Sequence, residues 1–563
     1  MRRMKNCAAM ALAAALLFSC QALAQGRREN GPPNLVVLLV VDQMRADYVD
    51  RYGHQWTRGL RRLMDHGAWF REAAYPYLYT FTCPGHATIS TGSLPATHGI
   101  IANAWYDRQA GRGVACTDDA QAPAVSYGAP AKGGYSAARL VVPTFADELR
   151  TQSAAPSRVV TVSMKARSAI MLAGHRADAA TWFDSPMGSW ETSAVYATAP
   201  VPFVEKFVKA HPVARDFGKS WTRMLPAQAY LYEDEAPGEK KSPNGSSAFP
   251  HPLQSKSGKP DAEFYDAWEG SPFSDAYLVE LARAAVDAEK LGQAKGTDFL
   301  GISFSALDVV GHLYGPRSHE AQDVLVRLDE ALGRLFEYLD QTVGPGNYIV
   351  AFSADHGVAP IPEQMVLAGM EAGRVSMKEV AERVEKTLES LPGPGPKVAR
   401  YSAGDIYFAP GVYAQLVADP PRMLAVAEAI LSVRGVARVL RSEDLAARRA
   451  TTDWVERAAS LSYFAGRSGD LMVLPKPYWF FAEEAYPIGT THSTPYGYDA
   501  RVPIFLMGRR ISPGEYLTAA TPADIAPTLA FLCGITLAPR DGRVLAEALT
   551  AGAASPGAGP AKR

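Results

Sequence analysis

Six side chains of the kinds that hold catalytic metal ions are spread along this 563-residue chain. They are three aspartates and three histidines: Asp42, Asp308, His312, Asp355, His356 and His492. Histidine is scarce in this sequence, with 11 in total, so three of them near expected loop ends stand out. Mixed nitrogen and oxygen ligands suit zinc better than magnesium or calcium. Two sites of three ligands each would suit in-line displacement at phosphorus, for which a pair of metal ions is a common device.

Each motif taken alone has a simpler interpretation. Asp308 and His312 are four residues apart, which puts both on one face of a helix, but such pairs also occur on solvated faces. Asp42 and Asp355 follow apolar runs and could cap the helices that come next. His492 lies in a turn-rich loop that is typical of surface histidines. The whole set, rather than any single motif, therefore supports the metal-site prediction.

The candidate nucleophile is Thr82, at the start of the segment Thr-Cys-Pro-Gly-His. A Pro-Gly-His turn before a helix of small residues would bring its hydroxyl to the helix N-terminus, where free amides and the dipole stabilise a developing alkoxide. A neighbouring metal ion would depress the hydroxyl pKa further. The alternative is that Thr82 only caps the helix. His86 and His98 are interpreted as structural.

Buried strands are the elements expected to position these residues. Continuous apolar runs typical of strands covered on both faces occupy residues 35–41, 159–163, 299–304, 348–352 and 502–507. Leucines spaced by three and four over 325–339 and the run 525–532, which Gly534 stops, predict helices between them. Alternation of strands and helices predicts an α/β fold, with a largely parallel central sheet covered by helices on both faces. Ligands then bind at the carboxyl ends of the strands, where four of these runs deliver charged residues.

The rest of the chain is organised around that domain, which we place at residues 25–550. Residues 215–275 are rich in Pro, Ser, Gly and Lys and predict a looped insertion. Residues 365–485 combine helices with short alternating strands and predict a second, cap-like insertion. The Ala/Gly/Pro-rich tail, 551–563, is predicted to be disordered.

As an ordered set, these residues resemble the alkaline phosphatase superfamily, on its threonine-nucleophile branch. The resemblance rests on Asp42, the Thr82 motif, Ser-Ala-Asp355-His356-Gly and Gly-Thr-Thr-His492. It extends to the phosphate-irrepressible alkaline phosphatases of bacteria, the PafA type. Those enzymes pair the nucleophile with an asparagine 21 positions later, here Asn103, and carry a Lys-x-Arg pair, here Lys165 and Arg167. The resemblance runs from about residue 34 to residue 535.

The resemblance implies a site that the residues alone do not give. Two Zn²⁺ ions would be bound per chain, the first by Asp42, Asp355, His356 and the Thr82 oxygen, and the second by Asp308, His312 and His492. Thr82 would attack a small-molecule phosphate monoester and form a phosphothreonine, and Asn103, Lys165 and Arg167 would bind the phosphoryl oxygens. Two extra cations favour a dianionic monoester over a diester.

Other functions remain open at this stage. A nucleotide pyrophosphatase/phosphodiesterase could use the same scaffold. A sulfatase is disfavoured, because Cys83 is followed directly by Pro84 and the required arginine is missing. A non-enzymatic zinc-dependent binding protein of the cell envelope is a third possibility. Because 57 basic residues balance 58 acidic ones, a strongly basic nucleic-acid binder is excluded.

The first 24 residues predict an exported protein. A basic start, an apolar run and Ala22-Leu23-Ala24 are typical of a cleaved secretory signal, so a periplasmic or secreted location is expected, with no stable membrane span. A lipoprotein anchor at Cys20 is disfavoured, because Phe18 fits that signal poorly. Cleavage leaves Cys83, Cys116 and Cys533, an odd number whose pairing the sequence leaves open. The oligomeric state is also open.

Overall fold

The computed structural model describes residues 31–128, 130–241, 245–447, 450–482, 488–538 and 540–550. The predicted signal, with the anchor candidate Cys20, and the predicted tail, 551–563, lie outside these residues. In the described parts of the chain, no helix combines the length and the apolar character that crossing a membrane would require.

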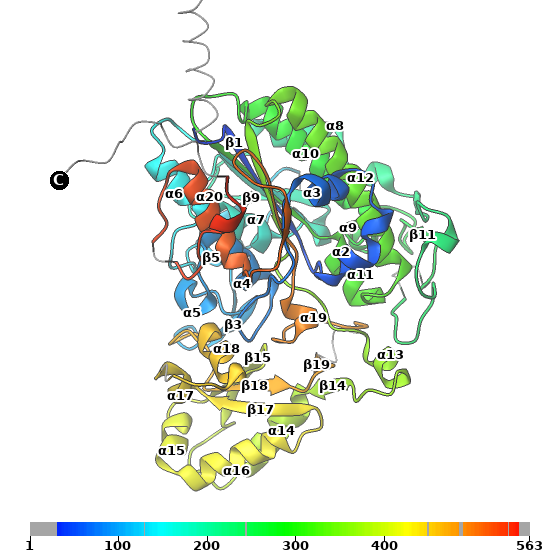
Figure 1. The fold of residues 1–563 in the computed structure, drawn as a ribbon. Coiled ribbons are helices and arrows are strands. Elements are labelled where there is room, and N and C mark those ends of the chain that lie inside the picture. The colour runs from blue at the N-terminus through cyan, green and yellow to red at the C-terminus, as the bar shows by residue number, and fades with distance from the viewer. Residues whose placement is uncertain are drawn as a thin grey trace, which may run out of the picture.

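An eleven-stranded sheet forms the centre of the molecule (Figure 1). Its strands are, in spatial order, β21 (Gly514–Tyr516), β2 (Ala68–Phe70), β20 (Ile504–Gly508), β13 (Tyr348–Ser353), β1 (Leu35–Val41), β12 (Asp298–Phe304), β7 (Val159–Ser163), β8 (Ala179–Asp184), β9 (Ser189–Ser193), β5 (Asp118–Ser126) and β6 (Gly134–Tyr135). The five strands from β13 to β8 run parallel, and β20 and β9 flank them antiparallel. This arrangement confirms the predicted α/β class with a parallel centre.

The predicted strands match the observed ones closely. Both β1 and β7 have the expected limits, and β12 and β13 each gain one residue. All seven residues of β1 are buried, which explains its unbroken Leu/Val run. The run at 502–507 forms β20, which is antiparallel to its neighbour β13.

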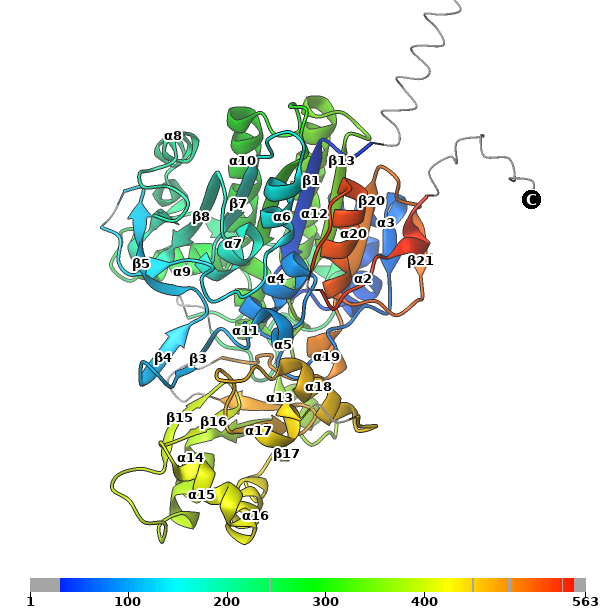
Figure 2. The same cartoon turned by 90° about the vertical axis from the view of Figure 1, so that its left-hand side faces the viewer.

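Helices cover both faces of the sheet (Figure 2). Alternate residues of β1 point into two separate hydrophobic clusters, one on each face. The first face is covered by α2 (Asp47–Tyr52), α3 (Gly59–His66), α8 (Pro202–Ala210), α9 (Ala262–Glu269), α10 (Pro272–Glu289), α11 (Ala306–Tyr314) and α12 (His319–Thr342). The second face is covered by α4 (Thr82–Thr91), α6 (Phe145–Gln152), α7 (Ala166–Ala173) and α20 (Ile525–Cys533). Both predicted helices are present, in α12 and α20, and α20 ends at Gly534 in the left-handed conformation.

A smaller module packs below the sheet in the view of Figure 1. Its four-stranded sheet has the order β15 (Val398–Ser402), β16 (Asp405–Phe408), β18 (Leu471–Pro475), β17 (Val436–Arg441), and β14 (Gly373–Ser376) pairs with β19 (Trp479–Ala482). Its helices are α14 (Met377–Thr387), α15 (Val412–Ala418), α16 (Pro420–Leu431), α17 (Ser442–Ala446) and α18 (Trp454–Ser462). It has a hydrophobic core of its own. We call residues 373–482 the cap, since they fall within the segment predicted to be cap-like.

The segment predicted as a looped insertion, 215–275, is only partly loop. It contains short turns and the two-residue strands β10 (Ser220–Trp221) and β11 (His251–Pro252), and then helix α9 from Ala262. Helix α9 forms because Asp261 accepts hydrogen bonds from two amides of its first turn, and Phe264 and Trp268, one turn apart, are both fully buried.

Candidate metal centre

Two adjacent parallel strands end at the first cluster of ligand candidates. Asp42 follows β1, and Asp355 and His356 follow β13, its neighbour in the sheet. All three side chains are fully buried. One ligand atom from each lies within 4.8 Å of the other two. We call these three residues group one.

A helix turn and a distant loop build the second cluster. Asp308 and His312 lie on α11, which begins directly after β12, and His492 comes from a loop late in the chain. Their ligand atoms also lie within 4.8 Å of one another. We call these three residues group two. The structure thus separates the six candidates into the two sets that the resemblance implied.

The three histidines all turn the same ring nitrogen toward the clusters. The Nδ1–H of His312 donates to the carbonyl of Thr490 at 3.0 Å, that of His356 to Gly357 at 2.9 Å, and that of His492 to Thr80 at 2.7 Å. A carbonyl only accepts, so each Nδ1 carries a proton, and in the neutral ring each Nε2 keeps its lone pair. This is the arrangement found around histidines that bind metals.

Lys165 and Gln43 connect the two groups. The Lys165 ammonium donates to Asp42 at 2.6 Å and to Asp308 at 2.5 Å. The Gln43 side-chain amide donates to Asp308 at 2.6 Å, and its backbone N–H donates to Asp355 at 3.1 Å. Gln43 holds a left-handed backbone (φ 69°), and Gly311 leaves room for its side chain, because a Cβ there would lie 1.7 Å from the Gln43 Oε1.

Crowding of carboxylates dominates the electrostatics of the site. Burial raises the pKa of Asp42 well above its usual range, and the charges of Asp308 and Asp355 raise it further. Burial acts on Asp308 in the same direction, but Lys165 and His312 outweigh it and hold the pKa of Asp308 well below its usual range. The carboxylates are thus crowded together, and Lys165 offsets part of their charge.

Burial also acts on the histidines. In His312 the charge of Asp308 outweighs burial and the pKa is raised. In the other two histidines burial prevails. It lowers the pKa of His356 and takes the pKa of His492 well below its usual range. The rings of these two residues stack with centroids 3.5 Å apart. Neutral imidazoles are the form that binds metal ions.

The donor set fits metal ions. Asp42 Oδ1 is buried and has no hydrogen-bond partner among the described residues. It lies 3.4 Å from Nε2 of His356, itself a ligand candidate. A buried, unpartnered carboxylate oxygen facing an imidazole lone pair is costly unless a cation lies between them. Three carboxylates and three imidazoles in two clusters make a mixed oxygen and nitrogen set.

Thr82 is the first residue of α4, and its hydroxyl lies 3.4 Å from Nε2 of His356 in group one. The prediction of a Pro-Gly-His turn ahead of the helix is wrong, because Pro84, Gly85 and His86 all lie inside α4. Proline is tolerated in a first helical turn, where its missing N–H would be unpaired anyway. Glycine is needed at position 85, since a Cβ there would lie 2.2 Å from the Asp355 carbonyl oxygen.

Asn103 lies next to the nucleophile candidate. Its side-chain carbonyl accepts the Cys83 amide at 2.8 Å, which turns the NH₂ end of the side chain away from Cys83. Cys83 and Cys116 form a disulfide, and Cys533 is a buried free thiol. The pairing that the sequence left open is thus assigned, and Cys83 does more than fill apolar space.

Both predicted cations are half-buried. Lys165 precedes α7, and Arg167 lies in the first turn of that helix. The Arg167 Nε is buried without a hydrogen-bond partner among the described residues. Both side chains line a cavity that Asp308 and His312 also line. These donors are placed to meet an anion beside the two groups.

Sequence reasoning missed two supporting residues. It did not single out Gln43, although this residue directly follows a ligand candidate, and it treated His86 as purely structural. The His86 Nδ1 lies 2.8 Å from the Thr82 carbonyl oxygen and 3.2 Å from Asp355 Oδ2, and its Nε2 lies 2.8 Å from the Ser303 hydroxyl. The signal that was available for His86 is its position, four residues after Thr82 and hence on the same helix face.

Comparison with known proteins agrees with this geometry. Residues 36–497 match the family model described as type I phosphodiesterase / nucleotide pyrophosphatase. The alkaline phosphatase PhoV of Synechococcus elongatus is 33% identical over 89% of this chain and 90% of its own length. A Myroides odoratus protein named calcium-transporting ATPase is 32% identical over 91% of this chain and 93% of its own length. The crystal structure of alkaline phosphatase PafA superposes with a TM-score of 0.84 at 30% identity, covering 92% of this chain and 99% of that one.

These matches span nearly all of the described chain. The chain therefore belongs to the type I phosphodiesterase / nucleotide pyrophosphatase family of the alkaline phosphatase superfamily and is a PafA-like member of it.

Proposed function

We propose that this protein is an alkaline phosphatase that hydrolyses phosphate monoesters through a phosphothreonine on Thr82. The observation that carries the proposal is the position of the Thr82 hydroxyl, at the N-terminus of α4 and 3.4 Å from group one. The relatives named alkaline phosphatase support the same activity. The relative named as an ATPase shares its essential chemistry, since both names describe hydrolysis at phosphorus.

Group one and group two would each hold one zinc ion, the first with the Thr82 oxygen as a further ligand. When bound, the two ions would supply positive charge for the attacking and leaving oxygens and would activate a water molecule. Zinc is favoured because imidazole nitrogens supply half of the ligands.

The residues of the chain then carry out a two-step exchange. The Thr82 Oγ1 forms a bond to phosphorus as the bond to the leaving alcohol oxygen breaks, which leaves a phosphothreonine. Water then attacks the phosphothreonine, releasing inorganic phosphate and restoring the hydroxyl. The transition state is loose, so positioning and charge supply most of the catalysis.

Three side chains recognise the phosphoryl oxygens. Asn103 donates from its NH₂ group, because its carbonyl is held by the Cys83 amide. Lys165 and Arg167 add two positive charges, and Arg167 carries the buried donor without a partner. A monoester brings two negative charges and a diester only one, so this pair favours the monoester.

Export is part of the proposal. Residues 1–24 carry the pattern of a cleaved signal, which would deliver the protein to the periplasm or beyond. The Cys83–Cys116 disulfide supports an oxidising location, because disulfides persist there and are rare in the cytosol. Cell fractionation, with and without residues 1–24, tests this part.

The test of the activity compares an aryl phosphate monoester with the matching diester on zinc-loaded protein. We expect a strong preference for the monoester. A preference for the diester would support the phosphodiesterase activity that the family description names. Two bound zinc ions without turnover of either ester would instead support a binding protein.

A further inference from the structure

A cavity of about 670 Å³ opens beside group two. It is lined by Asp308 and His312 of that group, together with the cations Lys165 and Arg167. The described residues that line it include no member of group one and not Thr82. The cavity therefore adjoins one side of the reaction centre only.

The proposed reaction indicates what this cavity would bind. Displacement at phosphorus is roughly in line, so the leaving oxygen departs on the side opposite the nucleophile. Thr82 lies against group one, 3.4 Å from His356. The leaving group consequently departs toward group two and enters the cavity that group two lines.

The far walls of the cavity are mixed: Lys241, His251, Asp266 and Glu269 line them beside an apolar portion. Trp221 of β10 and Leu253, just after β11, face it from the 215–275 segment. Leu313 and Tyr314 face it from α11, and Ala267 faces it from α9. Its volume lies in the range of about 300–1,000 Å³ that small-molecule sites occupy. It is therefore large enough for a ring-sized apolar group.

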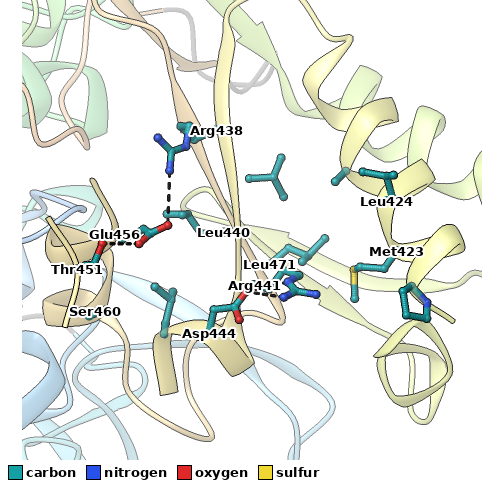
Figure 3. Close-up of a pocket in the computed structure, with 14 residues that line it drawn as sticks. Met423, Leu424, Arg438, Leu440, Arg441, Asp444, Thr451, Glu456, Ser460 and Leu471 are labelled. Atoms are coloured by element: carbon teal, nitrogen blue, oxygen red, sulfur yellow. Dashed lines mark hydrogen bonds and ion pairs between the residues drawn. The ribbon is translucent and has the colours of Figure 1, made fainter. Parts of the chain in front are cut away.

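A cavity of about 530 Å³ in the cap provides a contrast (Figure 3). Its charged side chains pair with one another. Arg441 bonds Asp444 at 2.7 Å, and Thr451 bonds Glu456 at 2.7 Å. The polar groups of the cap cavity thus satisfy each other, whereas the cavity beside group two includes Asp308 and His312 of the candidate metal centre and the unpartnered Arg167 Nε.

We infer that the cavity beside group two is the leaving-group subsite, an inference that rests on the proposed function. It selects phosphate monoesters whose leaving alcohol carries an apolar body of aromatic size. The leaving oxygen lies at Asp308 and His312, and the apolar body packs against Leu313, Tyr314 and Ala267.

The experiment fills part of the cavity with a larger side chain on one of its walls. Ala267→Phe adds a ring at a half-buried helix position, and Ala427→Phe makes the same change at a half-buried helix position in the cap cavity. For each protein, kcat/KM is measured for naphthyl phosphate and for ethyl phosphate. Changes in the ratio between proteins cancel the different intrinsic reactivities of the two esters.

We expect Ala267→Phe to lower the naphthyl/ethyl ratio about tenfold and Ala427→Phe to leave it unchanged, since only the first removes apolar space from the leaving group. Binding of naphthol, followed by its fluorescence, should weaken in parallel. Leu313→Ala, which adds no bulk, should lower the ratio about threefold and covers the case in which Ala267→Phe misfolds.

An unchanged ratio in folded, fully metal-loaded Ala267→Phe and Leu313→Ala would overturn the subsite. Failure of the wild-type protein to hydrolyse either ester would overturn the proposed function itself, so the two failures are distinguishable.

On the other side of Thr82, the Cys83–Cys116 disulfide holds Asn103 at two points. The Cys83 amide donates to the Asn103 side-chain carbonyl at 2.8 Å, and the Cys116 amide donates to its backbone carbonyl at 2.9 Å. The two donors belong to the two residues that the disulfide joins. Thr82 directly precedes one of them.

From this we propose that the disulfide is a positioning device that directs the Asn103 NH₂ group toward the phosphoryl oxygens beside Thr82. Without the bond, the segment that carries Cys116 would be tied less firmly to the start of α4. The amide would then lose its fixed direction, and turnover would fall although every contacting residue is still present.

A double-mutant cycle tests the device. Cys83→Ala/Cys116→Ala is compared with the wild type, and the same pair of changes is compared in an Asn103→Ala background. We expect about a tenfold loss of kcat/KM in the first comparison and less than about twofold in the second, since the disulfide acts through Asn103. Cys533→Ala, which removes the buried free thiol, is the matched control and should change neither.

Equal losses in both backgrounds would overturn the positioning role and assign the disulfide to stability alone. Inhibition by inorganic phosphate supplies a second measurement. It should weaken on removal of the disulfide only while Asn103 is present.

Discussion

Group one has two carboxylates and one imidazole, group two has one carboxylate and two imidazoles, and the fold holds the two groups differently. All three side chains of group one are fully buried and follow the ends of two neighbouring strands. In group two, the His312 side chain is 20% exposed, and the ligands come from one helix turn and one distant loop. A rigid sheet edge therefore holds the nucleophile side, and a more open, composite arrangement holds the side from which the leaving group departs.

The largest effect should come from changing Thr82, which lies against the buried group one. Thr82→Ala should lower turnover about 10³-fold or more while metal binding survives, because the three side chains of group one remain. Thr82→Ser should keep substantial activity, although its freer χ1 costs some of it. Near wild-type turnover by Thr82→Ala would mean that a water molecule attacks directly and that the threonine only begins its helix.

The two groups should lose their metal ions at different rates. A chelator should abolish activity, and zinc should restore it. We expect the metal of group two to leave first, because His312 is partly exposed and group one is not. Metal content followed against activity should show loss of function after about one ion per chain has gone. Full activity in metal-free protein would contradict the two-metal account.

Five of the six ligand candidates could be found from local pattern, because each follows an apolar strand or shares a helix turn. His492 lies in a loop and was indicated only by the whole set and the resemblance. The sequence could not predict the supporting contacts. Gln43 joins the groups through a left-handed backbone that no local pattern indicates, and Gly85 is required by the Asp355 backbone, 270 residues away. The α9 helix was missed for a similar reason, since Trp268 is buried against parts of the fold distant in sequence.

Lys165 and Arg167 line the cavity beside group two, the more exposed of the two groups. Replacing them tests whether this side selects monoesters. Arg167→Ala should lower monoester hydrolysis about 10–100-fold more than diester hydrolysis, as loss of a charge-assisted contact costs about 1.5–3 kcal/mol. Lys165→Ala should act in the same direction and also disturb both groups, since this lysine bonds Asp42 and Asp308. Equal losses on both esters would show that these cations do not select monoesters.

Stability should also distinguish the two groups. Asp355→Ala leaves the Gln43 and His356 amides without their acceptor, so the free energy of unfolding should fall by about 1–3 kcal/mol. His312→Ala removes a partly exposed ring and should cost less. Denaturant unfolding of the metal-free proteins measures both, and an equal or reversed order would contradict the structural contrast between the groups.

The smallest effect concerns pH in the metal-free protein. Burial and the neighbouring Asp308 and Asp355 charges raise the pKa of Asp42 in the folded state. The folded chain therefore keeps a proton that the unfolded chain loses, and this residue lowers stability as pH rises above the ordinary aspartate pKa of about 4. Asp42→Asn should weaken that decline in melting temperature between pH 5 and pH 8, measured without metal. An unaltered decline would mean that Lys165 already neutralises Asp42.

The central claim is that Thr82 carries the phosphoryl group during turnover. The most direct measurement quenches the zinc-loaded protein in acid during hydrolysis of a monoester and sequences its peptides by tandem mass spectrometry. The account predicts one added phosphoryl group on Thr82 in the peptide that begins α4, and none in Thr82→Ala. A phosphoryl group on any other residue, or an unmodified Thr82 peptide in enzyme quenched during steady turnover, would contradict it.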